Sequence, residues 1–233
     1  MDTLIKIWEP TFLKPLAILI SLLCIIIFFG PSNRQSNIPL SIKLYLIAFF
    51  VGFTSNDLVV LWNNNYSEST RLICIYIDFV LTIIEFILLM YFFYSINKKN
   101  SQKKILLFLS IVFSIVTVFL FIFMQFGSTY RQHAVVWLYT IQVCFLLIPV
   151  FFYFQHLFST KTVGDVSGVP TFWIASGIAF FAFCTVMLSI VETFFLYDKP
   201  VLLGKLYPIY YLFYVLMFLF FLIAHLCNKA TFK

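Results

Sequence analysis

Long runs of apolar residues alternate with short polar breaks along the whole chain. A helix needs about 20 mostly apolar residues to cross the hydrocarbon core of a bilayer. Seven runs meet this requirement, and they predict transmembrane helices at about residues 12–29, 42–62, 72–94, 105–126, 134–154, 171–196 and 206–227. The pattern therefore predicts an all-α fold, in which a polytopic membrane protein forms a bundle of seven transmembrane helices.

The polar breaks contain residues that end helices. Examples are Gly30-Pro31-Ser32 after the first run, three asparagines at 63–65 after the second, and Asp198-Lys199-Pro200 after the sixth. Glycine and proline interrupt helices, and polar runs lie outside the hydrocarbon core. None of these loops is long enough to hold a soluble domain, so we expect a single transmembrane domain over residues 1–233.

Composition narrows the class of protein further. Hydrophobic residues make up 63% of the chain and charged residues 10%, whereas an ordinary soluble domain has about 25% charged residues. A soluble fold could not bury so much apolar surface, which excludes soluble enzymes and nucleic-acid-binding domains. The five cysteines lie in apolar runs without a CxxC pair or a Cys/His cluster. We therefore expect no metal site and no cofactor.

The basic residues predict an orientation in the cell membrane. Short cytoplasmic loops carry an excess of Lys and Arg. With the N-terminus outside, the inner side holds nine Lys and Arg and the outer side six, and four lysines between residues 98 and 104 give the strongest single signal. We predict a multi-pass protein of the cell membrane with its N-terminus outside and its C-terminus in the cytoplasm. This rule explains the net charge of +6, so we expect no nucleic-acid partner.

Four acidic residues fall inside the predicted spans: Asp57, Asp78, Glu85 and Glu192. An intramembrane acid costs roughly 2.5–3.5 kcal/mol on insertion scales, and its default interpretation is functional. Asp78, Thr82 and Glu85 are spaced i, i+4 and i+7, which places them on one stripe of the third helix. Such a stripe is expected to face the interior of the bundle rather than lipid.

Other polar side chains fall mostly in the same half of the bilayer as these acids. They include an amide beside Asp57, a glutamine on the fifth span and tyrosines on the seventh. Together they predict a polar, acidic cavity that opens to the outer face. The predicted ligand-binding residues are Asn56, Asp57, Asp78, Thr82, Glu85, Gln142, Glu192, Tyr210, Tyr211 and Tyr214.

The same residues also have a purely structural interpretation. An acid near a helix end, such as Glu192, can reach the headgroup region, and tyrosines can form the aromatic belt that anchors helix ends. Asn and Thr side chains can join helices by hydrogen bonds, worth about 0.6 kcal/mol each. Both interpretations stay open at this point.

Enzyme and retinal-binding motifs do not fit the chain. We find no HExxH, no GxSxG and no Gly-rich phosphate loop, and we predict no catalytic residues. The run Asp78-Phe79-Val80-Leu81-Thr82 resembles the Asp-aromatic-x-x-Thr of microbial rhodopsins, in which the Asp is the Schiff-base counter-ion. The interior of the seventh span has no lysine, so we expect no covalently bound retinal.

The segment Pro170-Thr171-Phe172-Trp173-Ile174-Ala175-Ser176-Gly177 resembles the start of the sixth helix in uncharacterised bacterial seven-helix integral-membrane proteins. Some of those proteins resemble the membrane part of sensor histidine kinases. The resemblance implies a sensory or receptor-like module in the lipid bilayer. Because no kinase domain accompanies the helices, it also implies a signalling partner protein or a homo-oligomer.

The alternative function is transport of a small polar or cationic solute. Seven helices also resemble the SWEET sugar transporters and PnuC-type vitamin transporters, which consist of two three-helix repeats around a linker helix. Parallel repeats would make the first three spans similar to the last three. The sequence shows no such similarity, which favours the sensory interpretation.

Overall fold

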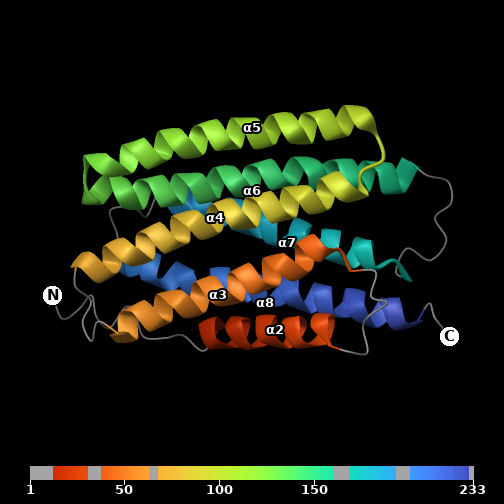
Figure 1. Cartoon of the computed structure of the whole chain (residues 1–233), viewed down its shortest axis with the longest axis horizontal. Coiled ribbons are helices and arrows are strands. Elements are labelled where there is room, and N and C mark those ends of the chain that lie inside the picture. The colour runs from red at the N-terminus through yellow and green to blue at the C-terminus, as the bar shows by residue number, and fades with distance from the viewer. Residues whose placement is uncertain (1–12, 31–37, 63–67, 160–167, 193–199, 231–233) are drawn as a thin grey trace. The chain divides into compact units, whose positions relative to one another are not determined.

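The computed structural model describes residues 13–30, 38–62, 68–159, 168–192 and 200–230 (Figure 1). Within these ranges the protein has seven α-helices, one short 3₁₀ helix and no strand. The elements are α2 (Leu13–Phe29), α3 (Leu40–Trp62), α4 (Glu68–Ile96), α5 (Asn100–Phe123), η3 (Met124–Phe126), α6 (Ser128–Ser159), α7 (Pro170–Val191) and α8 (Pro200–Ala230). The predicted all-α fold with seven helices is confirmed.

The lengths and compositions of the helices fit a multi-pass membrane protein. Six of the described helices are long and apolar enough to cross a membrane, and α2 is a shorter apolar helix of 17 residues. α6 has 32 residues, which corresponds to about 48 Å at about 1.5 Å per residue. It is therefore longer than the hydrocarbon core, which is about 30 Å thick. The orientation of the termini stays a prediction.

The helix ends differ from the predicted ends mainly because the helices continue past their apolar parts. α6 begins at Ser128 and α8 at Pro200, about one and a half turns before the predicted starts at 134 and 206. Backbone hydrogen bonds continue a helix into the headgroup region, whereas the apolar pattern reports only the part within hydrocarbon. The predicted end of the sixth span at residue 196 lies outside the described residues.

The chain forms two compact units. The first contains residues 1–38 and 150–233, and the second contains residues 39–149. The boundary falls within α6, between Pro149 and Val150. The expectation of a single transmembrane domain stays a prediction.

In the second unit, α3 and α4 run antiparallel. Asn56 of α3 bonds to Asp78 of α4, and Gly52 lies against Leu81, so residue numbers fall along one helix as they rise along the other. Aromatic packing adds α5, because the rings of Phe86 and Phe113 stack with centroids 3.8 Å apart. The N-terminal part of α6 belongs to the same unit.

In the first unit, α8 packs against both α7 and α2. Gly177 of α7 faces the main chain of Met217 and the Cβ of Phe220 on α8. On the other side, the Cys24 thiol of α2 donates a weak hydrogen bond to the Phe218 carbonyl oxygen at 3.8 Å. α8 is thus the central helix of this unit.

Candidate functional site

In the second unit, Asp78 is joined to α3 by a short hydrogen bond. The Asn56 Nδ2 donates to the Asp78 Oδ1 at 2.6 Å. Thr82 is buried, and its hydroxyl donates to the Asp78 carbonyl oxygen of its own helix at 2.8 Å. Two of the predicted residues, one on each helix, therefore meet directly, and the third bonds within its own helix.

Glu85 belongs to a second polar group in the same unit. Its side chain is buried, and it lies within electrostatic range of the Tyr45 hydroxyl on α3. Tyr139 of α6 also lies within electrostatic range of that hydroxyl. Three helices, α3 with Tyr45, α4 with Glu85 and α6 with Tyr139, therefore contribute ionisable side chains to this group.

Gln142 lies one helical turn beyond Tyr139 on α6, on the same face of that helix. Its side chain is fully buried, and neither amide atom has a hydrogen-bond partner within the described part of the chain. A buried polar group without a partner costs about 1–3 kcal/mol. Among the predicted residues, Gln142 is therefore one whose amide can still form hydrogen bonds to a ligand.

Sequence reasoning did not select Tyr45 and Tyr139. Spacing was the signal that could have found them. Tyr45, Gly52 and Asn56 are related by i, i+7 and i+11 on one stripe of α3, and Tyr139 precedes Gln142 by three residues.

The polar groups of this unit lie at two levels along α3 and α4. Asn56 and Asp78 mark one level. Tyr45 lies 11 residues from Asn56 towards the start of α3, or about 16 Å, and Glu85 lies seven residues from Asp78 towards the end of α4, or about 10 Å. Polar chemistry is therefore not confined to one end of the α3–α4 pair.

In the first unit, Glu192 is bonded to α8. The carboxylate follows directly after α7 and is buried, and the Tyr210 hydroxyl donates to its Oε2 at 2.9 Å. The Ser189 hydroxyl lies 3.4 Å from the same tyrosine oxygen. An acid, a phenol and a hydroxyl from two helices therefore form one buried network.

The remaining predicted residues have less specific surroundings. Tyr214 is buried, and its ring packs against Phe181 with centroids 4.5 Å apart, which fits the structural interpretation for this residue. Tyr211 and Asp57 are half-buried. The predicted ligand-binding residues are thus divided between the two units. That they all line one ligand cavity stays a prediction.

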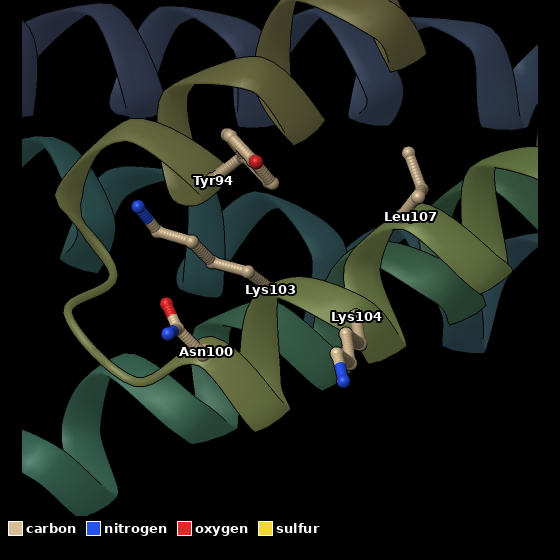
Figure 2. Close-up of a pocket in the computed structure, with 5 residues that line it drawn as sticks. All are labelled: Tyr94, Asn100, Lys103, Lys104 and Leu107. Carbon is tan, nitrogen blue, oxygen red and sulfur yellow. The ribbon is translucent and has the colours of Figure 1, made fainter.

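In the second unit, a hollow lies at the turn between α4 and α5 (Figure 2). Its lining consists of Tyr94, Asn100, Lys103, Lys104 and Leu107 and includes none of the predicted ligand-binding residues. Among the described residues, no group of three His, Cys, Asp or Glu side chains could hold a metal ion.

Comparison of the chain with protein families, with curated proteins and with solved structures finds no match. The chemistry of the buried polar groups is therefore the basis for a functional proposal.

Proposed function

We propose that this protein is a sensory or receptor-like module of the membrane that binds a small polar or cationic ligand and acts with a partner protein. The observation that supports the proposal is the polar cluster of Tyr45, Glu85 and Tyr139, which comes from three helices of one compact unit. The buried Gln142 lies one turn from Tyr139 on α6 and extends this cluster. Buried acids in membrane helices are costly and mark functional sites by default.

The side chains of the cluster favour a ligand that carries hydrogen-bond donors or positive charge. A carboxylate in a low-dielectric interior attracts a cation strongly. Tyrosine rings add cation–π attraction, and the unused amide of Gln142 can both donate and accept. Small amines and quaternary ammonium compounds combine these properties.

Ligand binding at such a cluster would change how α3, α4 and α6 pair. A ligand shifts a conformational equilibrium only by its differential affinity for the two states. Bonds to Glu85 and Gln142 would favour the state in which the helices that carry them stay together. A partner protein would then respond to that state of the helices.

The test is the thermal stability of the purified protein in nanodiscs. Choline is the cationic probe and glucose the neutral polar probe. We expect saturating choline to raise the Tm of the wild type by about 2–4 °C, which corresponds to about 1 kcal/mol for a protein of this size. Glu85→Gln keeps the shape of the side chain and should abolish the shift.

The matched control for this test is Glu68→Gln. Glu68 lies in the first turn of the same helix and is exposed, so its variant should respond to choline like the wild type. An unchanged response in Glu85→Gln, or an equal loss in both variants, would contradict the proposal.

A second candidate, transport of the solute, is favoured by two observations. The polar groups at two levels along α3 and α4 offer contacts at two depths, and Pro149 and Pro208 lie inside α6 and α8. Proline removes one backbone hydrogen bond from a helix and makes it easier to bend. Saturable uptake of labelled choline into proteoliposomes would support transport, whereas binding without uptake supports the sensory module.

A further inference from the structure

The hollow at the α4–α5 turn has features that the proposed function does not use. Its volume is about 260 Å³, and the side chains of both helices line it. In Figure 2, Lys103 extends past the ring of Tyr94, Asn100 lies on the other side of the Lys103 side chain, and Lys104 points in another direction. The hollow therefore combines one half-buried lysine with a neutral amide and a phenol.

The local charge is strongly positive. The turn from 97 to 104 carries Lys98, Lys99, Lys103 and Lys104, and the sequence has no acid between residues 86 and 164. The Lys103 ammonium lies 5.0 Å from the centroid of the Tyr94 ring, a cation–π contact that holds this side chain at the hollow. The start of α5 adds the positive end of a helix dipole.

Apolar surface continues directly from this charge along α5. Leu107 lines the hollow with 59% of its surface exposed, and Phe108 and Ile111 are 63% and 53% exposed. Surfaces of this kind suit lipid acyl chains and not water. A charged hollow next to an apolar helix face is complementary to an amphiphile with an anionic head.

We propose that the α4–α5 hollow is a binding site for the phosphate of an anionic phospholipid headgroup. The Lys103 ammonium and the Asn100 amide donate hydrogen bonds to the phosphate oxygens, the Tyr94 hydroxyl adds a donor, and an acyl chain lies along Leu107 and Phe108. Charge-assisted hydrogen bonds of this type are stronger than neutral ones. The site is independent of the acid cluster around Tyr45.

Two double variants distinguish a specific lipid site at the hollow from a basic surface that attracts anionic lipid without a defined site. Lys103→Gln with Lys104→Gln removes two charges that line the hollow, and Lys98→Gln with Lys99→Gln removes two exposed charges from the same turn. The full-length protein is reconstituted in phosphatidylcholine vesicles, and electron spin resonance measures its preference for spin-labelled phosphatidylglycerol over spin-labelled phosphatidylcholine.

We expect the wild type to prefer phosphatidylglycerol. Each lysine near a membrane surface contributes about five-fold to the association with anionic lipid, so the Lys103/Lys104 variant should lose at least about five-fold of this preference. The Lys98/Lys99 variant should lose less than half as much on a logarithmic scale. Equal losses in the two variants would overturn the proposal and would indicate general electrostatic attraction by the whole basic turn.

A neutral substitution keeps the test valid if the lysine variants fail to fold. Tyr94→Leu removes the phenol and the cation–π contact without changing the charge, and it should lower the preference by at least two-fold. An unchanged preference would contradict a specific lipid site at the hollow.

Inorganic phosphate in excess should not displace the lipid, and displacement would overturn the lipid assignment in favour of a site for free phosphate.

Discussion

At the scale of single residues, two acids, one half-buried and one buried, accept hydrogen bonds from neutral donors on a neighbouring helix. Asp78 accepts from the Asn56 amide, and Glu192 accepts from the Tyr210 hydroxyl. Each acid is thereby tied to a second helix, in contrast to a side chain that only reaches towards the headgroups. The bonds make a structural contribution that can be measured apart from any ligand.

Removing the Tyr210 hydroxyl should destabilise the first unit. Tyr210→Phe leaves the buried Glu192 carboxylate without its donor, and an unsatisfied buried group of this kind costs about 1–3 kcal/mol. We expect the free energy of unfolding, measured by SDS titration in mixed micelles, to fall by that amount. Tyr91→Phe is the control, because Tyr91 is largely exposed.

The double variant tests the cause of the Tyr210→Phe effect. Glu192→Gln replaces the carboxylate by a neutral amide, which is less costly to leave without the phenol. Tyr210→Phe with Glu192→Gln should therefore be more stable than Tyr210→Phe alone. Simple additivity of the two substitutions would mean that the hydroxyl and the carboxylate do not interact.

At the scale of elements, the sequence was sufficient to predict seven helices but not their mutual contacts. Apolar runs report which residues lie in hydrocarbon, so the spans were found and their headgroup ends were missed. The acids were found because charges are rare in such runs. Tyr45 and Tyr139 were missed because the chain has 13 tyrosines, and the packing of neighbouring helices decides which of them meets an acid.

The close contact between α7 and α8 is one feature that the apolar pattern could not predict. A Cβ added at Gly177 would lie 2.8 Å from the Phe220 Cβ and 3.1 Å from the Met217 carbonyl oxygen. These atoms belong to the main chain or lie next to it, so they cannot rotate away. Small residues permit such approaches between membrane helices.

We expect Gly177→Ala to destabilise the protein by about 1–3 kcal/mol, the usual effect of overpacking. The clash should outweigh the gain in helix propensity, because α7 and α8 must separate to admit the methyl group. SDS titration of the purified variant measures the change. Gly168→Ala is the control, since no atom lies within 4 Å of the added Cβ; an equal effect at both positions would refute the packing explanation.

At the scale of the whole molecule, the orientation in the membrane is the prediction that affects function most. A cysteine placed at Ser101, in the exposed first turn of α5, should resist a membrane-impermeant thiol reagent in intact cells. A cysteine at the exposed Ser69 should react. The native cysteines set the baseline, and permeabilised cells should label both variants.

The reverse labelling pattern would place the N-terminus in the cytoplasm. The lysine-rich turn would then face outward, and the level of Asn56 and Asp78 would lie nearer the cytoplasm. The hydrogen bonds within each unit would be unaffected by this inversion.

The first unit combines helices from two distant parts of the chain, and this determines when it can assemble during synthesis. α2 is made well before α8, yet the Cys24 thiol of α2 bonds to the Phe218 carbonyl oxygen, 194 residues further along the chain. The second unit consists of consecutive helices, so its contacts can form while the ribosome is still translating. α2 must wait in the bilayer without α8 until the helices between them have been made. During that interval, lipid or an insertion chaperone must cover the face of α2 that later contacts α8.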